Sequence, residues 1–554
     1  MSEKEYIVVV KRGIDLNEID AEMQSSSGND VIPQRAVDVA NARVGSKRMT
    51  HYALTDEEAT RLSNDPRVLS VEIPVEQRED IVIDLNAQRL NNYDKPATTS
   101  NAPASGNFVN WGLIRSNQIS NFYSGTNNNN SSTDYFNYVL DGTGVDVVIQ
   151  DSGIDPDHPE WEDANGNSRL QQIDWYTASG LSGTQNANHY RDYDGHGTHV
   201  ASTAVGKEFG WAKNAQIYSQ KLNGLEGSGD SGTGISITNA FDTIRLWHNA
   251  KTNGRPTVVN MSWGTSLPFQ GSSRYTGLGG NYRGTGWNFG VDYTTESALV
   301  SATGFNPAWT LYGSDGGSAQ RIPVRASQYD AEVEDMIDDG IHICIASGNQ
   351  MHKIDIVGGL DYDNTFTYGG STYYYHRGSS PYTDEAFMVG NLAGGDTFYS
   401  GSPVANTDVP SITSNYGPGC NIWAPGQHIC AANSSDTSRS DQPYYFNNSY
   451  RQMSIGGTSM ASPQVAGVCA LFLQAYPNLT PAQLQKMIFD YSKPTVNFTQ
   501  TGSTDYDVYP TGTYLNFSPS SCGGPNRHLF NPYNKATPVS AIGSGSITGM
   551  KLVV

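Results

Sequence analysis

The sequence predicts an α/β protein built on a mainly parallel sheet and preceded by a small α+β unit. From Trp111 onward, short apolar runs typical of buried parallel strands alternate with stretches of helical periodicity. We expect strands at residues 145–150, 258–261 and 341–346, and helices at residues 235–249 and 327–339. This alternation is typical of a parallel sheet with helices on both faces.

Residues 1–80 are expected to form the small separate α+β unit. Residues 6–10 are a β-branched run that favours a strand, and residues 68–73 alternate as a strand does. Apolar residues at helical spacing follow the first strand, at Leu16, Ile19 and Met23. A second helix is expected to begin with the capping box at Thr55 and to end before Pro66.

The rest of the chain divides by composition. Residues 81–110 lose the periodicity and are expected to be a linker, with an exposed stretch at 95–107. The α/β domain is expected at residues 111–500. Residues 501–554 are irregular, and we expect a C-terminal extension packed on the α/β domain, with a closing strand at 550–554.

The net charge and the length of the apolar runs limit the kinds of binding partner and location that we expect. The 554 residues carry a formal net charge of −21, and phosphate binding needs a basic face, so a nucleic-acid partner is not expected. We interpret the many carboxylates as a solvated surface. The apolar run in MSEKEYIVVV is too short for a secretory signal, and no segment reaches transmembrane length. We therefore expect neither a membrane span nor export by the usual route.

The five cysteines form no CxxC pair, so neither a zinc site nor a dense disulfide framework is expected. They are Cys344, Cys420, Cys430, Cys469 and Cys522. Cys344 and Cys469 lie in apolar runs and are expected to be buried thiols. A disulfide between Cys420 and Cys430 is left open.

Two of the expected strands lead into a polar residue. Asp151 directly follows the strand at 145–150, and Asn349 comes shortly after the strand at 341–346. Ligands bind at the carboxyl ends of parallel strands, so both residues are candidates for function. Each also has an ordinary alternative, because Asp-Ser-Gly triplets are commonly turns and asparagine commonly caps a helix.

A histidine flanked by glycines, His196, enters an apolar helix in the stretch DGHGTHVA. His199 stands three residues later, and the two histidines suggest a metal pair. No carboxylate at a helical offset supplies a third ligand. We therefore favour a catalytic role for His196 and a structural hydrogen bond for His199.

Ser459 lies in the stretch GGTSMASP, whose small residues let the backbone turn tightly into a helix. Because proline is tolerated in the first turn of a helix, Pro463 places Ser459 at the helix N-terminus. Free N–H groups and the helix dipole there favour a nearby negative charge. Residues 465–471 are apolar nearly all round, so we expect a buried helix that presents Ser459 rigidly as a nucleophile.

Together these four segments resemble the subtilisin-like serine peptidase family. The order Asp, His, Ser is that of subtilisin, and GTSMASP is a highly specific motif. The resemblance spans residues 111–495. Further agreement comes from Ile154, Asp155, His158, Pro159, SNYG at 414–417 and APG at 424–426. Two Gly/Tyr/Ser-rich insertions of low periodicity, at 264–323 and 361–382, depart from the family pattern.

The resemblance implies a three-layer αβα peptidase domain. It also implies that residues 1–80 are a ferredoxin-like inhibitory propeptide, since residues 53–55, 64–66 and 71–72 are similar to that domain. The unit would act as an intramolecular inhibitor, and the stretch 78–110 would contain the processing site.

The resemblance assigns the chemical roles as well. Ser459 would attack the peptide carbonyl, with His196 as general base and Asp151 holding the imidazole. The Ser459 N–H and the Asn349 side chain would bind the oxyanion. A protein or peptide substrate would lie extended along two edges, Ser262, Trp263 and Gly264 on one side and Gly227, Ser228 and Gly229 on the other. Ordinary strand-end and turn structure is the alternative for both edges.

This chemistry requires no cofactor. Calcium is a recurrent partner of the family, and Asp155, Asp157 and Glu160 are candidate oxygen ligands for a structural calcium ion. The alternative is that these carboxylates are simply solvated.

Two other functions are consistent with the sequence. The missing signal and the Asn/Gly/Tyr-rich insertions suggest a structural or binding protein on a peptidase fold, such as a component of a virus particle or surface layer. A self-processing maturation enzyme would act on partners in the same larger assembly. The presence of all four residues, Asp151, His196, Asn349 and Ser459, favours an active endopeptidase. We leave open an extracellular or virion-associated location, which the protein would reach by a route other than a secretory signal.

Overall fold

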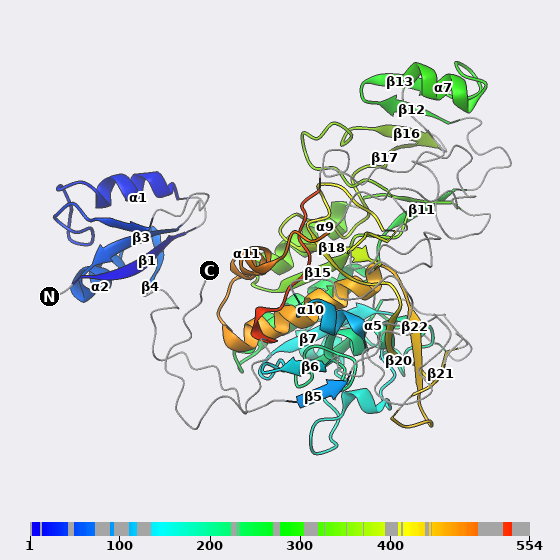
Figure 1. Ribbon diagram of the computed structural model, residues 1–554, viewed down its shortest axis with the longest axis horizontal. Helices are drawn as coiled ribbons and strands as arrows, with labels where there is room; N and C mark the ends of the chain where they lie inside the picture. Colours follow the sequence, from blue (N-terminus) through cyan, green and yellow to red (C-terminus); the bar gives the residue numbers. More distant parts are fainter. Residues whose placement is uncertain are drawn as a thin grey trace. The chain divides into compact units, whose positions relative to one another are not determined.

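Figure 1 shows the computed structural model of the chain, coloured from blue at the N-terminus to red at the C-terminus. The described residues are 3–11, 14–41, 49–72, 89–92, 110–118, 135–222, 230, 232–235, 237–269, 278–303, 320–325, 327–350, 352–368, 371–393, 408–411, 414–437, 442–444, 446–496 and 524–534. They fall into two compact units, one up to residue 72 and one from residue 89. Most of the expected linker at 81–110 and all of the strand expected at 550–554 lie outside the described residues.

The N-terminal unit has the element order βαββαβ around its own apolar core. Its elements are β1 (Lys4–Val10), α1 (Leu16–Met23), β2 (Val39–Asn41), β3 (Met49–Leu54), α2 (Asp56–Leu62) and β4 (Val68–Glu72). The sheet has the order β2-β3-β1-β4 and all its pairings are antiparallel. This order and pairing make the unit ferredoxin-like. Its core includes Tyr6, Val8, Ile19, Tyr52 and Leu62.

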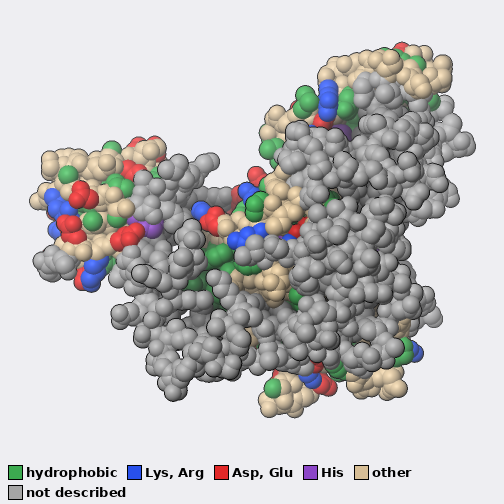
Figure 2. Space-filling view, viewed as in Figure 1, with side chains coloured by type: hydrophobic (Ala, Val, Ile, Leu, Met, Phe, Trp, Pro, Cys, Tyr) green, Lys and Arg blue, Asp and Glu red, His purple; other side chains and the backbone are tan. Residues whose placement is uncertain are grey.

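Local signals in the sequence place most of this unit correctly. Thr55 and Glu58 form the expected capping box of α2, which ends at Leu62 ahead of Pro66. Strands β2 and β3 were not expected, because β2 is short and β3 mixes polar with apolar residues. On the face seen in Figure 2, acidic and basic side chains are interspersed over this unit, and one exposed ion pair joins Lys4 to Asp56.

The second unit is built on a seven-stranded sheet in the order β19-β18-β15-β10-β7-β9-β8, with every neighbouring pair parallel. The strands are β7 (Asp146–Asp151), β8 (Leu170–Gln171), β9 (Gln216–Lys221), β10 (Thr257–Met261), β15 (His342–Ala346), β18 (Phe387–Leu392) and β19 (Ile422–Pro425). All residues of β7, β10 and β15 are buried, as expected for a sheet covered on both faces. The three strands expected from the apolar runs are confirmed.

Helices cover both faces of this sheet (Figure 1). They include α4 (Trp175–Ser179), α5 (His196–Val205), α6 (Ile237–Ala250), α9 (Ser327–Asp338) and α10 (Thr458–Ala475). Val259 of β10 packs in one core with Phe241 of α6 and Met336 of α9. The next residue, Asn260, accepts a hydrogen bond from Ser462 of α10. Helix α10 in turn packs against α5. Because successive strand residues point to opposite faces, α6 with α9 and α5 with α10 form the two outer layers.

Helix α10 is almost entirely buried, as expected, but Pro463 does not lie in its first turn. The helix begins at Thr458, so the proline falls in the second turn, and the helix continues past it. Proline has no N–H, and it therefore leaves the carbonyl of Ser459, four residues earlier, without its helical hydrogen bond. That carbonyl is available to a donor outside the helix.

The described parts of the two insertions contain regular structure, which their sequence did not predict. Strands β12 (Gly279–Tyr282), β13 (Thr285–Asn288), β16 (Thr365–Tyr368) and β17 (Ser371–Tyr374) make an antiparallel sheet in the order β13-β12-β16-β17. Helix α7 (Glu296–Thr303) contacts β13, and β11 (Ser266–Phe269) and β14 (Gln320–Pro323) form a separate antiparallel pair. Trp287, Phe366 and Tyr375 belong to a small aromatic core. Four-residue strands rich in Gly and Tyr are too short to give a periodic signal.

The remaining elements of the second unit lie outside the seven-stranded sheet and the helices named above. They are β5 (Arg89–Asn92), α3 (Trp111–Arg115), β6 (Tyr135–Tyr138), η2 (Pro159–Trp161), β20 (Ile429–Asn433), β21 (Gln442–Pro443), β22 (Arg451–Ile455), α11 (Pro481–Tyr491) and η3 (Pro532–Asn534). Within the described ranges, no helix is long and apolar enough to cross a membrane.

Four cysteines lie in the described residues, and all four are buried free thiols: Cys344, Cys420, Cys430 and Cys469. The disulfide considered between Cys420 and Cys430 is therefore not present. Cys344 of β15 and Cys469 of α10 are thus the buried thiols that we expected, and their sulfurs lie 3.9 Å apart.

Within the expected extension, Arg527 and Leu529 form backbone hydrogen bonds to Trp423 of β19. A buried charge cluster joins this segment to α3. Arg115 donates from Nε to Asp408 at 2.7 Å, and Nδ1 of His528 lies 3.4 Å from the same carboxylate. Burial alone would raise the pKa of Asp408, but His528 and Arg115 together hold it well below its usual value.

Asp408→Ala should lower the free energy of unfolding of the protein by about 3–5 kcal/mol, because Arg115 would stay buried without its partner. Urea unfolding checks this, with Asp363→Ala as the control, since the Asp363 side chain is 82% exposed and pairs only at the surface. The depressed pKa further implies that the Asp408 contribution persists at neutral pH and fades as the pH falls below the usual range of an aspartate. Equal losses in the two variants would contradict the assignment.

Candidate active site

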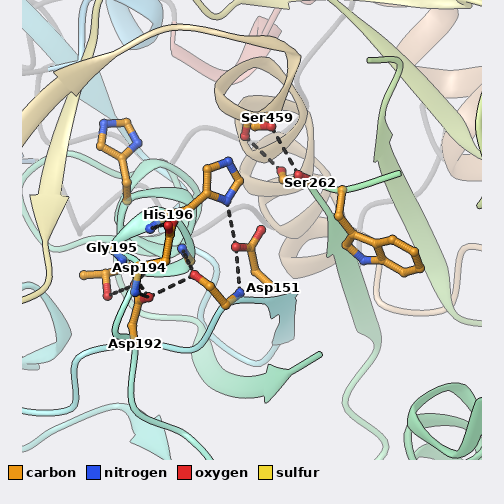
Figure 3. Close-up of polar contacts among 12 residues, drawn as sticks. Asp151, Asp192, Asp194, Gly195, His196, Ser262 and Ser459 are labelled. Atoms are coloured by element: carbon orange, nitrogen blue, oxygen red, sulfur yellow. Dashed lines mark hydrogen bonds and ion pairs between the residues drawn. The ribbon is translucent and has the colours of Figure 1, made fainter. Parts of the chain in front are cut away.

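Asp151, the first candidate residue, ends β7 at the carboxyl edge of the sheet. Oδ1 of its buried carboxylate accepts hydrogen bonds from the Ser152 N–H at 2.8 Å and from Nδ1 of His196 at 2.7 Å. In the view of Figure 3 the His196 imidazole lies between Asp151 and Ser459. The structure thus brings together a carboxylate and an imidazole that are 45 residues apart in the chain.

His196 is the first residue of α5, and a tight turn presents it. Gly195, the N-cap, has φ 92°, a left-handed conformation that glycine adopts readily. A Cβ at this position would also collide with Oδ1 of Asn433. Both the positive φ and this close contact favour glycine ahead of His196.

Asp192 holds this turn in place, and the sequence analysis missed it. It is fully buried and accepts hydrogen bonds of 2.6–2.9 Å from the Ser152 hydroxyl, the Gly195 N–H, and the N–H and hydroxyl of Thr198. Burial raises the pKa of Asp192, and these donors oppose that shift. Asp192 ties the turn after Asp151 to the first turn of α5. The available signal was an acidic residue just ahead of a helix N-terminus, where N–H groups lack partners.

His199 has the structural role expected of it. Its ring is fully buried, and Nε2 lies 3.0 Å from the carbonyl oxygen of Ile429 on β20. Among the described residues, no group of three or more His, Cys, Asp or Glu side chains is placed to hold a metal ion.

The three carboxylates considered for calcium differ in burial and in hydrogen-bond partners. Asp155 accepts a hydrogen bond from the Ser435 hydroxyl at 2.8 Å, while the Asp157 side chain is exposed. Glu160 is fully buried and accepts from the Tyr444 hydroxyl at 2.8 Å, and burial raises its pKa. A structural calcium ion stays a prediction.

Ser459 is the second residue of α10 and forms a reciprocal pair with Ser262, which follows β10 (Figure 3). The Ser459 hydroxyl donates to the Ser262 carbonyl at 3.1 Å, and the Ser262 hydroxyl donates to the Ser459 carbonyl at 2.9 Å. The second bond uses the carbonyl that Pro463 leaves without a helical partner. Asn260 supports the pair by donating to the Ser262 hydroxyl at 2.9 Å. These bonds fasten the N-terminus of α10 to the end of β10.

Asn349 meets the same helix end from the turn after β15. Its Oδ1 accepts hydrogen bonds from the N–H and the hydroxyl of Thr458, at 2.9 and 3.0 Å. This network assigns the amide orientation, so that Nδ2 is the group directed away from Thr458. Asn349 and Ser459 therefore lie at one helix N-terminus.

One of the two predicted substrate edges lies within the described residues. Ser262, Trp263 and Gly264 follow β10 directly. The Trp263 indole donates to Gln150 at 3.2 Å and packs against Phe241, so its ring faces inward. The other edge, Gly227, Ser228 and Gly229, lies outside the described residues.

Ser262→Ala should lower the free energy of unfolding by about 1 kcal/mol, because the Ser459 carbonyl loses its donor. In a Pro463→Ala background, position 463 regains an N–H that reaches the same carbonyl, so the loss should be smaller. Urea unfolding of the four proteins in a double-mutant cycle measures both values. Identical losses in the two backgrounds would show that the proline does not free this carbonyl.

The chain matches the Subtilase family over residues 142–504, well over half of its length. The matched residues include Asp151, His196, Asn349 and Ser459. Among solved structures, a cold-adapted subtilisin-like serine proteinase is similar over 76% of this chain, with 20% identity and a TM-score of 0.42. The family assignment therefore rests on the sequence match.

Named relatives agree with this match. The chain is 24% identical to the extracellular serine proteinase of Thermus sp. (strain Rt41A), over 89% of this chain and 85% of that protein. It is 25% identical to alkaline serine exoprotease A of Vibrio alginolyticus and to subtilisin-like protease 1 of Trichophyton equinum, and spans 64% of each. The chain therefore belongs to the subtilase family of serine endopeptidases.

Proposed function

We propose that this subtilisin-like serine endopeptidase cleaves peptide bonds with Ser459 as nucleophile, His196 as general base and Asp151 as the carboxylate that orients the base. The observation that carries the proposal is the 2.7 Å hydrogen bond between Nδ1 of His196 and Oδ1 of Asp151. A carboxylate on Nδ1 holds the ring proton there and leaves Nε2 as the base. It also stabilises the imidazolium that forms during the reaction.

The Ser459 proton must pass to His196 as Oγ attacks the carbonyl carbon of the substrate. In the free enzyme this hydroxyl donates to the carbonyl of Ser262. A rotation about the Ser459 Cα–Cβ bond would turn it to Nε2, and such contacts are commonly loose before substrate binds. His196 then returns the proton to the leaving amine. Water repeats the sequence on the acyl-enzyme and releases the second product.

The negative oxygen of the tetrahedral intermediate needs donors that are already in place. We assign them to the Ser459 N–H and to Nδ2 of Asn349, whose carbonyl oxygen Thr458 holds. The first N–H groups of α10 have no helical partner, and the helix dipole is positive at this end. Preorganised donors need little rearrangement as the charge develops, which is the source of their effect on rate. No cofactor is needed for these steps, since side chains and backbone supply every group.

The proposed substrate is a protein or peptide chain bound as an extended strand along Ser262, Trp263 and Gly264. Because the Trp263 ring packs inward, the backbone of this edge is the surface left for substrate. The Gly227–Gly229 edge is proposed for the opposite side.

We propose that the N-terminal unit is an intramolecular inhibitor that the enzyme removes from itself. Two observations support this role. The unit has a core of its own, and its ferredoxin-like strand order precedes the peptidase unit in the chain. Cleavage is expected between residues 78 and 110.

Ser459→Ala should abolish peptide hydrolysis, with a loss in kcat of about 10⁶-fold, the size measured for subtilisin. The variant should also keep its N-terminal unit, which intact mass spectrometry detects. Ser492→Ala is the matched control, because the Ser492 hydroxyl only caps the carbonyl of Ile488 on α11. Undiminished hydrolysis by the Ser459 variant would exclude the mechanism, and normal trimming would exclude self-processing.

Asn349→Ala should lower kcat about 10²–10³-fold and leave KM nearly unchanged, because the amide acts on the oxyanion and not on the bound peptide. Steady-state kinetics with a chromogenic peptide separates the two constants. A variant that changes KM alone would place Asn349 in substrate binding instead.

A further inference from the structure

The turn that carries Asn349 is organised by one buried side chain outside the proposed catalytic set. We propose that Asn415, in the connection between β18 and β19, is a positioning residue that sets the place of the Asn349 amide for oxyanion stabilisation. The inference rests on the role proposed above for Asn349. Asn415 is fully buried and therefore acts through the turn, without touching substrate.

Asn415 contacts the chain on both sides of Asn349. Its backbone N–H donates to the carbonyl of Gly348 at 2.9 Å, and its Nδ2 donates to the carbonyl of Ser347 at 2.7 Å. Its Oδ1 accepts from the N–H of Gln350 at 3.1 Å and from the N–H of His352 at 2.8 Å. A further bond joins Nδ2 to Oε1 of Gln350 at 3.2 Å. Four backbone groups around Asn349 therefore depend on one residue.

These bonds use the full capacity of the asparagine side chain, which offers two donor hydrogens and an acceptor oxygen with two lone pairs. An apolar replacement would leave the Ser347 carbonyl and two N–H groups without these partners in a turn whose two ends, Ser347 and His352, are buried. Unsatisfied groups of this kind are relieved by movement of the backbone. Any such movement displaces the residue at the centre of the turn, which is Asn349.

The turn has a second attachment, on the side of the nucleophile. The Gly348 N–H donates to the Thr458 hydroxyl at 3.1 Å, and Thr458 also holds Oδ1 of Asn349. Gly348 itself has φ 103°, and a Cβ there would collide with Nδ2 of Asn415. The turn is thus clamped between Thr458 at the start of α10 and Asn415 on the far side. Thr458 fixes the amide to the helix, and Asn415 fixes the backbone beneath it.

A double-mutant cycle tests the proposal. Asn415→Ala should lower kcat about 10–100-fold, because a displacement near 1 Å at a catalytic group has effects of that order, while KM changes little. In the Asn349→Ala background, adding Asn415→Ala should change kcat less than threefold, since the residue through which it acts is gone. Titration with a serine-directed fluorophosphonate counts the active molecules and corrects kcat for any misfolded fraction.

Asn421→Ala is the matched control. This asparagine also bridges two backbone groups, the Met388 N–H at 2.9 Å and the Ala386 carbonyl at 2.8 Å, but at the start of β18. It should lower the thermal stability while kcat stays unchanged. If Asn415→Ala does not fold, Asn415→Ser, which keeps a hydroxyl in the turn, is measured in the same cycle.

The outcomes separate the two assignments. A loss in kcat for Asn349→Ala with none for a folded Asn415 variant would overturn the positioning role alone. Full additivity of the two losses would overturn it as well. An unchanged kcat in Asn349→Ala would instead remove the proposed oxyanion role, whatever the Asn415 variants do.

Discussion

The site depends on how the start of α10 is fastened to the carboxyl edge of the parallel sheet. Thr458 bonds to Asn349 after β15, Ser459 exchanges hydrogen bonds with Ser262 after β10, and Ser462 donates to Asn260 within β10. Apolar packing around the buried helix fixes its depth in the molecule, and packing alone is not directional. The hydrogen bonds of its first turns fix the rotation of α10 about its own axis and its position along that axis. Together they hold Ser459 against both neighbouring strand ends.

Burial is distributed unevenly over the proposed catalytic groups, and this distribution suits their roles. The Asp151 side chain is 4% exposed, whereas that of His196 is 23% exposed. A buried carboxylate keeps its hydrogen bond to the ring free of competing water. The more open imidazole stays within reach of a substrate. The Asp192 side chain completes the arrangement, because it accepts hydrogen bonds from both of the turns that carry Asp151 and His196.

The sequence allowed much of this site to be predicted, because each predicted residue stands beside a strong local signal. Asp151 and Asn349 follow apolar strands, His196 lies between glycines, and Ser459 precedes a long buried helix. The signals beside the supporting residues are weaker. Asp192 stands ahead of a helix N-terminus and Asn415 lies in the stretch SNYG, but neither pattern tells what the residue bonds to. Their roles become visible only in the contacts that the fold gives them. The prediction that Pro463 lies in the first turn of its helix was wrong by one turn. A proline is tolerated in the second turn here because the Ser262 hydroxyl donates to the carbonyl that would otherwise lack a hydrogen bond.

The same reasoning explains the insertions. Their strands are four residues long and rich in Gly and Tyr, so periodicity could not reveal them. Their sheet exists only because β12 of the first insertion pairs with β16 of the second, and the ion pair between Arg283 and Asp361 joins them again. Each insertion is therefore half of one folding module. Grafting either half alone onto a relative would leave β12 or β16 with an unpaired edge open to aggregation, so a successful transplant has to move both halves together.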